Sequence, residues 1–377
     1  MHRREAPLRP NGGAAIRLAH VRKHYPGAAQ AAVGDLSLDV PEGEVVVLVG
    51  PSGCGKTTVL KMVNRLVEPT AGEIHVLGED VRSVAAPVLR RRIGYVIQQI
   101  GLFPHRTVEA NVATVPRLLG WDRRRIRDRV AELVELVGLD PALLQRYPSE
   151  LSGGQQQRVG VARALAADPP ILLMDEPYSA VDPIVRARLQ DELLALQRRL
   201  HKTIVLVTHD VDEAIKLGDR VAILNVGGVL AQYAPPAELL RAPADDFVAA
   251  FLGSERGLKL LSLVTVGQVA SIEGPVVDGD VTPGEAAAVM RRFGVDWVGV
   301  RAGGRLVGWV ADRDLDGRRR VADAPAQPFN AALRPDTTLR EALDVLINSR
   351  TRVAVLVDDD HRYLGMLTVD QIAEGLR

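Results

Sequence analysis

The sequence predicts an α/β protein with more than one domain, and three features support this prediction. Short apolar runs alternate with amphipathic segments, one apolar run leads into a glycine-rich loop, and the last third of the chain repeats itself. Alternating strands and helices are typical of a parallel sheet covered by helices. Because 377 residues exceed the usual size of one domain, we expect two or three compact units.

Charge, cysteine content and hydropathy exclude several classes of protein. Basic and acidic residues balance at 47 each, whereas a nucleic-acid-binding chain usually carries a basic excess, so we expect no nucleic acid partner. One cysteine, Cys54, excludes an intrachain disulfide and fits a reducing compartment. No run approaches the roughly 18 apolar residues of a membrane-spanning helix. Residues 1–15 are expected to be a flexible tail and not a secretory signal.

The first apolar runs, residues 16–21, 36–40 and 44–49, are expected to be strands. The third is almost entirely valine and leucine, which is typical of a strand buried on both faces of a sheet. Behind the glycine loop that follows it, Val59, Met62 and other apolar residues recur at helical spacing. The sequence therefore predicts strand, glycine loop and helix in direct succession.

That loop, residues 50–57, fits the pattern G-x-x-x-x-G-K-[ST]. Its glycines allow several backbone N–H groups to face phosphate oxygens, assisted by the positive end of the next helix. Lys56 is expected at the β- and γ-phosphates and Thr57 at Mg²⁺; a glycine turn with a solvated lysine is the alternative. The expected nucleotide contacts from this segment are Gly50, Pro51, Ser52, Gly53, Cys54, Gly55, Lys56, Thr57 and Thr58.

Cys54 lies inside this loop, and we interpret it as a packing residue. Alkylation of its thiol is expected to block nucleotide binding, because the adduct would fill the phosphate site.

The remainder of this domain continues the alternation of helices and strands. The expected elements are a mostly helical region at 107–147, a strand at 171–174, a helix at 189–200, a strand at 203–207, short strands within 220–232, a helix that ends near Phe251, and a linker at 253–257. The strand at 171–174 ends at Asp175 and Glu176. An acidic residue there is where a P-loop enzyme holds Mg²⁺, and its neighbour could act as a general base. Alternatively, the two carboxylates could cap a helix or lie in solvent.

Residues 151–155, Leu-Ser-Gly-Gly-Gln, resemble the signature sequence of ABC-type ATPases. The other family motifs occur in the same order. Tyr25 resembles the aromatic residue that stacks on adenine, and Gln98 the glutamine that links the Mg²⁺ site to the membrane subunits. Residues 179–182 resemble the D-loop, and His209 resembles the switch histidine that contacts the γ-phosphate.

The resemblance implies a P-loop ATPase domain with a helical subdomain at residues 16–253. In this family two copies enclose two ATP molecules, and the signature of one copy closes over the P-loop of the other. Further nucleotide contacts implied by the resemblance are Tyr25, Gln98, Ser152, Gly153, Gly154, Gln155 and Asp182. The implied catalytic residues are Lys56, Glu176 and His209, and the implied Mg²⁺ ligands are Thr57, Gln98 and Asp175.

Three further stretches, residues 95–105, 150–170 and 210–217, resemble importers of glycine betaine, carnitine and choline. This implies an ATP-hydrolysing subunit at the cytoplasmic face of the plasma membrane, which works with separate permease subunits and, indirectly, a substrate-binding protein. The alternatives are import of another small solute, or an ABC ATPase that is not linked to transport.

The C-terminal region, residues 254–377, contains an internal repeat. Glu285 and Ala286 recur 56 positions later as Glu341 and Ala342, and similar β-runs follow each copy. The repeat resembles a tandem CBS pair, with units at about 258–320 and 321–377. CBS units in related transporters bind an adenine nucleotide or sense ionic strength.

The nucleotide pocket of this pair departs from the usual pattern of threonine followed three residues later by aspartate. The first copy has Ala311 with Asp314, and the second has Thr368 with Gln371. A regulatory and a mainly dimer-stabilising role both remain open. The basic run at 318–320 could be a solvated turn or a contact with anionic lipid.

Overall fold

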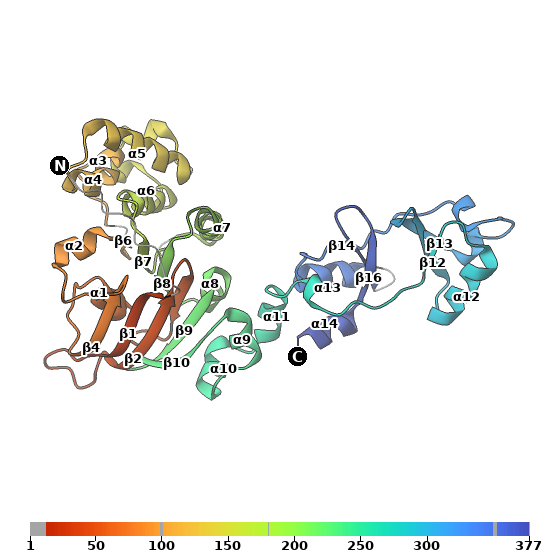
Figure 1. The fold of residues 1–377 in the computed structure, drawn as a ribbon, viewed down its shortest axis with the longest axis horizontal. Helices are drawn as coiled ribbons and strands as arrows, with labels where there is room; N and C mark the ends of the chain where they lie inside the picture. Colours follow the sequence, from red (N-terminus) through yellow and green to blue (C-terminus); the bar gives the residue numbers. More distant parts are fainter. Residues whose placement is uncertain (1–12, 99–100, 180, 350–352, 377) are drawn as a thin grey trace. The chain divides into compact units, whose positions relative to one another are not determined.

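A computed structural model describes residues 13–98, 101–179, 181–349 and 353–376. The chain divides into two compact units, residues 1–239 with 243–251 and residues 240–242 with 252–377 (Figure 1). Both units are α/β, as the sequence predicts. No helix in the described ranges is both long and apolar enough to cross a membrane.

A six-stranded sheet forms the centre of the first unit, in the order β10-β9-β3-β8-β7-β6. Its strands are β3 (Val45–Val49), β6 (Ile93–Val96), β7 (Ile171–Asp175), β8 (Thr203–Val207), β9 (Arg220–Asn225) and β10 (Val229–Ala234). Neighbouring strands are parallel except β10, which is antiparallel to β9. All residues of β3, β7 and β8 are buried, because helices or other strands cover both faces. Their carboxyl ends therefore meet at one edge of the sheet.

A second, antiparallel sheet of the same unit has the order β2-β1-β4-β5. Its strands are β1 (Ala14–Lys23), β2 (Val33–Pro41), β4 (Ala71–Val76) and β5 (Glu79–Asp80). Most of the expected tail, residues 1–12, lies outside the described residues. The boundary at residue 15 is wrong, since Ala14 pairs with Pro41 and Ala15 is buried. Apolar residues of β1, β2 and β3 pack in one core with those of the helix behind the glycine loop.

The helices of this unit pack against the central sheet and form a separate cluster beside it (Figure 1). Those near the sheet are α1 (Lys56–Val63), α2 (Ala86–Arg91), α7 (Pro183–Leu200), α8 (Val211–Leu217), α9 (Pro236–Arg241) and α10 (Asp246–Leu252). The cluster contains α3 (Val108–Val112), α4 (Thr114–Leu118), α5 (Arg123–Leu136) and α6 (Gly153–Leu165). The helical region predicted at 107–147 corresponds to α3, α4, α5 and a short 3₁₀ turn.

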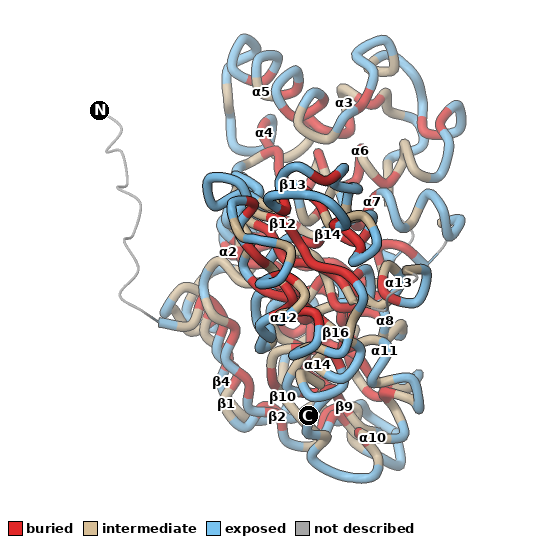
Figure 2. The backbone as a smooth tube through the Cα atoms, turned by 90° about the vertical axis from the view of Figure 1, so that its right-hand side faces the viewer, coloured by how far each residue is buried: buried red, intermediate tan, exposed pale blue. Residues whose placement is uncertain are grey.

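The second unit contains two copies of one small fold. Each copy has a three-stranded sheet in which the first pair of strands is parallel and the second antiparallel. The strands are β11 (Val276–Asp278), β12 (Trp297–Ala302) and β13 (Arg305–Ala311), then β14 (Ala332–Leu333), β15 (Val353–Val357) and β16 (Tyr363–Thr368). Figure 2 shows buried positions along β12, β13 and β16 and exposed positions on the surrounding loops.

The helices of the two copies confirm the repeat seen in the sequence. Helix α12 (Pro283–Phe293) and helix α13 (Leu339–Asn348) both begin with a capping box, Thr282 with Glu285 and Thr338 with Glu341. The chain ends with α14 (Val369–Gly375). The expected linker at 253–257 is too long, because α11 (Arg256–Leu261) starts within it and buries Leu260 and Leu261.

Candidate functional site

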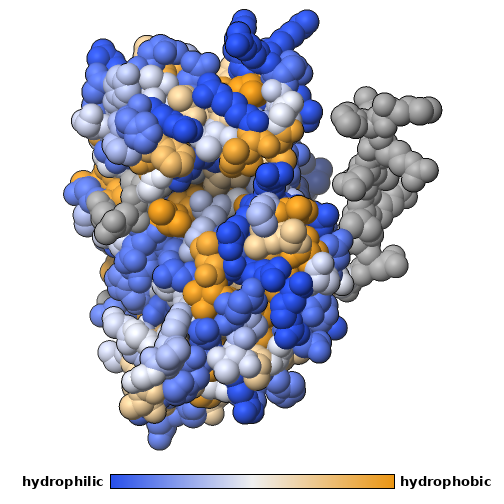
Figure 3. All heavy atoms as spheres, turned by 90° about the vertical axis from the view of Figure 1, so that its left-hand side faces the viewer, coloured by the Kyte–Doolittle hydropathy of each residue, from blue (hydrophilic) through white to orange (hydrophobic). Residues whose placement is uncertain are grey.

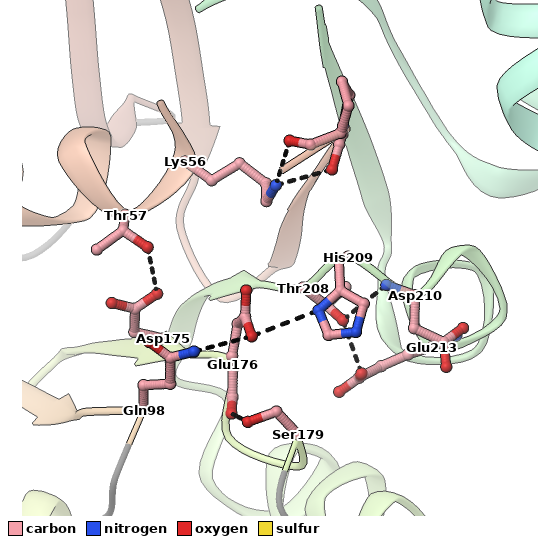
Figure 4. Close-up of polar contacts among 12 residues, drawn as sticks. Lys56, Thr57, Gln98, Asp175, Glu176, Ser179, Thr208, His209, Asp210 and Glu213 are labelled. Carbon is pink, nitrogen blue, oxygen red and sulfur yellow. Dashed lines mark hydrogen bonds and ion pairs between the residues drawn. The ribbon is translucent and has the colours of Figure 1, made fainter. Parts of the chain in front are cut away.

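The candidate site lies where β3, β7 and β8 end. The glycine loop follows β3, Asp175 and Glu176 stand at the end of β7, and Thr208 and His209 follow β8 (Figure 4). Backbone bonds join these ends: Glu176 N–H donates to Val207 O at 2.9 Å, and Thr208 N–H donates to Leu48 O at 3.1 Å. The parallel register thus brings together groups far apart in the sequence.

The glycine loop wraps around the ammonium group of Lys56. Its Nζ donates to Gly50 O at 2.7 Å and to Pro51 O at 3.0 Å, and the side chain is only 6% exposed. Gly55, just before α1, has φ of +98°, and a Cβ there would lie 2.3 Å from Ala32 O. Only glycine fits at position 55, because a side chain there would collide with the backbone of Ala32.

Thr57 and Asp175 place two oxygen groups next to each other beside this loop. Thr57 Oγ1 donates to Asp175 Oδ1 at 2.9 Å. Burial raises the pKa of the Asp175 carboxyl, the neighbouring charge of Glu176 raises it further, and the Thr57 hydrogen bond opposes both. A buried carboxylate with a nearby hydroxyl provides the ligand atoms that a hard divalent cation prefers.

Glu176 is contacted by two side chains from other segments. Gln98 Nε2 donates to its Oε2 at 3.1 Å, and His209 Nδ1 lies 3.3 Å from the same oxygen (Figure 4). The backbone of Glu176 has φ of +44°, an uncommon conformation for a residue with a side chain. Ser179 stabilises this turn, since its Oγ donates to Glu176 O at 3.1 Å. Backbone strain of this kind is concentrated at functional sites.

The signature and D-loop residues stand at helix starts. Ser152 caps α6, forming a capping box in which its hydroxyl accepts from the N–H of Gln155. Asp182 caps α7 by accepting from the Ile184 N–H at 2.9 Å. Among the described residues no hydrogen bond or ion pair joins 152–155 to the glycine loop. Ala180 of the D-loop lies outside the described residues, as do Gln99 and Ile100.

Tyr25 lies in the turn after β1 and is 37% exposed. Its ring is 5.0 Å from Lys23 Nζ, a cation–π contact.

Sequence reasoning missed a buried acid behind His209. Glu213 on α8 is 6% exposed, and burial, with a smaller contribution from Asp210, raises its pKa to about 7. It lies four residues after His209 and next to the apolar residues Ala214 and Ile215 of α8, which was a signal that could have identified it.

A cavity of about 310 Å³ lies elsewhere in this unit, between α6 and α7. Gln157 and Arg158 line one side, and Leu189 and Leu193 line the other. The glycine loop contributes nothing to its lining, so this cavity is separate from the candidate site.

Comparisons with known proteins agree with this geometry. The sequence profile of the ABC transporter family matches residues 33–179, and that of the CBS domain matches residues 326–377. An osmoprotectant import ATP-binding protein, OsmV from Salmonella typhimurium, is 46% identical over 96% of both chains. A choline transport ATP-binding protein, OpuBA from Bacillus subtilis, is 44% identical over 94% of both chains. The dimeric structure of a bacterial ABC transporter cassette superposes with a TM-score of 0.53 at 34% identity, covering 59% of this chain and 98% of that one.

The parallel sheet, the lysine-bearing loop and the Asp-Glu pair beside it define an ABC-type ATPase, which binds and hydrolyses ATP. Within that class, the chain belongs to the ATP-binding proteins of osmoprotectant ABC importers that carry a CBS region. The family predicted from the signature sequence is therefore confirmed.

The burial of Cys54 changes the expectation for its alkylation. The side chain is fully buried, with Sγ 3.6 Å from Lys56 Nζ. A thiol reagent should therefore leave Cys54 unmodified in the folded chain and modify it after unfolding in urea. Mass spectrometry of the labelled peptide measures both states. Rapid labelling of the native chain would contradict the packing described here.

Proposed function

We propose that the residues gathered at this edge hydrolyse ATP, with Glu176 as the general base. The observation that carries this proposal is the convergence of Gln98 and His209 on one carboxylate oxygen of Glu176. Both contacts involve Oε2. They hold the carboxylate in place while Oε1 remains to accept a proton from the attacking water.

Lys56 and the backbone N–H groups of residues 52–57 would bind the β- and γ-phosphates. The lysine now bonds two carbonyls of its own loop, at 2.7 and 3.0 Å. These contacts preorganise the ammonium group at the centre of the loop, so little side-chain entropy remains to be lost when phosphate binds. Tyr25 would stack on the adenine.

Mg²⁺ fits the oxygen groups of this site. Such an ion usually binds one or two carboxylates together with substrate phosphates and water. Thr57 Oγ1 and Asp175 Oδ1 are 2.9 Å apart and would hold it, with the amide oxygen of Gln98 as a third ligand. When bound, the ion would neutralise charge on the phosphates.

A second copy of the chain would complete the site. The first N–H groups of a helix have no partner within that helix. In α6 the Ser152 hydroxyl accepts from Gln155, which leaves the N–H groups of Gly153 and Gly154 to bind the γ-phosphate held by the other copy. Asp182 would contribute to the same interface. The dimeric state of the related cassette supports this arrangement.

The partners in transport would be permease subunits that dock on the first unit, with a substrate-binding protein acting through them. Exposed apolar side chains on the helical cluster, Leu118 at 63% and Leu119 at 37%, are suited to such docking. Figure 3 shows hydrophobic areas between hydrophilic ones on one face of the molecule. Docking would hold the chain at the cytoplasmic face of the plasma membrane.

The solute would be a compatible solute of the glycine betaine, choline or carnitine type. The names of several relatives support this class, among them a glycine betaine/carnitine/choline transport ATP-binding protein from Bacillus subtilis, 43% identical over 94% of both chains. We assign the ATPase domain to residues 14–253, beginning with β1, and the CBS pair to 254–377, with units at about 258–320 and 321–377.

In the CBS pair, two side chains disfavour a nucleotide ligand. The Thr368 hydroxyl donates to Gln371 in a capping box, and the first copy has Ala311, which carries no hydroxyl. Residues 318–320 are three exposed arginines. We therefore favour an anionic lipid surface as the regulatory partner of this pair.

Replacement of Glu176 by Gln should lower turnover by a factor of about 10² to 10⁴, because the general base is lost. ATP binding and ATP-dependent dimerisation should persist. Lys56→Ala is the matched variant that should lose nucleotide binding itself. Equilibrium binding of labelled ATP and steady-state phosphate release measure the two effects separately. If Glu176→Gln lost ATP binding, its role as a base would be wrong.

Cells that lack this chain should lose ATP-driven uptake of at least one of glycine betaine, choline and carnitine. Uptake of each labelled solute is compared before and after complementation with the wild-type chain, with Lys56→Ala as the inactive control. Normal uptake of all three solutes would contradict the proposed solute class and leave the ATPase assignment intact.

Replacing Arg318, Arg319 and Arg320 together by Gln should flatten the dependence of ATPase activity on ionic strength in proteoliposomes with anionic lipid. Contacts between exposed charges are screened over a Debye length of about 10 Å at 0.1 M salt. The matched control replaces three dispersed, exposed arginines of the same unit, Arg291, Arg305 and Arg340. An identical salt profile in both triple variants would rule out this contact.

A further inference from the structure

A polar network lies behind His209, and the proposed reaction does not use it. Two of its buried atoms, Arg186 Nε and Glu213 Oε1, have no hydrogen-bond partner among the described residues. Buried polar atoms without partners are rare in native proteins, and they call for an explanation of the groups that carry them. Both side chains approach the segment Thr208-His209-Asp210 (Glu213 is shown in Figure 4).

Arg186, on the first turn of α7, connects the D-loop to this segment. Its Nη2 donates to Val181 O at 3.2 Å, immediately before the cap residue Asp182. Its Nη1 lies 3.7 Å from Asp210 Oδ2. A displacement of the D-loop would therefore move a charge that acts directly on Asp210.

Glu213 secures the other side of the same segment. Its Oε2 accepts from Thr208 Oγ1 at 2.8 Å, and that hydroxyl accepts in turn from the Asp210 N–H at 3.1 Å. Thr208 is 2% exposed and Glu213 is 6% exposed, so water does not compete with these bonds. His209 thus lies between Thr208, which is hydrogen-bonded to Glu213, and Asp210, which lies near Arg186.

Helices α7 and α8 have a second connection. Lys216 on α8 forms an ion pair with Asp191 at 2.7 Å and donates to Ala187 O at 3.3 Å, both on α7. These contacts link the two helices, and Arg186 and Glu213 in turn contact the residues on either side of His209.

We propose that Arg186 and Glu213 are positioning residues that hold His209 against Glu176 and relate its position to that of the D-loop. The inference rests on the proposed roles of Glu176 and His209. The contact from His209 Nδ1 to Glu176 is 3.3 Å, which is already long for a hydrogen bond. A shift of a few tenths of an ångström at Asp210 or Thr208 would break it. Neither positioning residue would touch ATP.

The charges around Glu213 provide a readout that is independent of folding. Burial is the main cause that raises its pKa to about 7; the Thr208 hydrogen bond lowers the pKa, the charge of Asp210 raises it, and Arg186 and His209 lower it. Tyr178 is the other titratable group that faces it. The carboxylate, present above that pH, is the stronger acceptor for Thr208. Because the hydrogen bond between Thr208 and Glu213 positions His209, turnover should rise with increasing pH through an inflection near pH 7. Glu213→Gln should remove that inflection.

The experiment measures ATP hydrolysis by the full chain reconstituted with its membrane subunits. Arg186→Gln should lower kcat by about 10-fold to 100-fold, the size of effect expected when a reacting group is misplaced, and should change the KM for ATP less than twofold. Arg186→Lys, which keeps the charge near Asp210, should recover part of that loss. Arg188→Gln is the matched control, because Arg188 lies on the same helix, is exposed and pairs with Glu192.

Glu213→Gln should lower kcat in the same way, and the double variant should lose less than the product of the two single effects, because both act through His209. An unchanged kcat in Arg186→Gln and Glu213→Gln overturns the inference. The inference is also overturned if these variants lose both melting temperature and ATP affinity, because that result would show that the two residues have a structural role. If Arg186→Gln fails to fold, Arg186→Lys and Glu213→Gln decide the question.

Glu176→Gln, assayed in parallel, tests the proposed reaction separately from the proposed roles of Arg186 and Glu213. If that variant keeps wild-type turnover, the proposed reaction fails and the inference fails with it. If it loses turnover while the Arg186 and Glu213 variants do not, only the inference is wrong.

Discussion

The parallel arrangement of β3, β7 and β8 is the constraint on which the site depends. Adjacent parallel strands end at the same edge of the sheet. The phosphate loop (residues 50–57), the acidic pair (residues 175 and 176) and the histidine segment (residues 208–210) therefore lie close together, although more than 150 residues separate the first from the last. The strands are buried along their whole length, and a one-residue slip would exchange the faces of every side chain. Burial of apolar strands thereby fixes the geometry of the polar groups at the candidate site.

Much of this arrangement was predictable because its signals are local. The valine-rich strand before the glycine loop, the loop itself and the run that ends at Asp175 are each written in a few consecutive residues. The Glu-Ala pairs that revealed the repeat are equally local, and their glutamates belong to the capping boxes of α12 and α13. The family resemblance then supplied roles for Gln98 and His209 that spacing alone did not indicate.

The features that escaped prediction are those that only tertiary contacts define. Nothing near Glu176 in the sequence requires its φ of +44°, which depends on the turn closed by Ser179 and on the bond to β8. In the sequence, nothing distinguishes Arg186 from the other arginines of its amphipathic helix. Only the structure shows its contacts with Val181 and Asp210. The predicted linker at 253–257 includes the first two residues of α11, a helix whose position depends on the burial of Leu260 and Leu261 further along the chain.

In the proposed dimer, one copy of the chain would hold an incomplete site. Three parts of the site lie at one edge of the central sheet: the P-loop, the two carboxylates and the histidine segment. The N–H groups of Gly153 and Gly154 belong instead to α6, which among the described residues has no hydrogen bond or ion pair to that edge. A nucleotide bound to one copy alone would leave part of its γ-phosphate without donors, and unpaired polar groups are costly once water is excluded. Association would supply those donors, so the free energy of nucleotide binding and that of dimerisation are necessarily coupled. The D-loop lies at that same interface in the proposed dimer, and its carbonyl contact with Arg186 gives the histidine segment a physical route by which to respond to the partner.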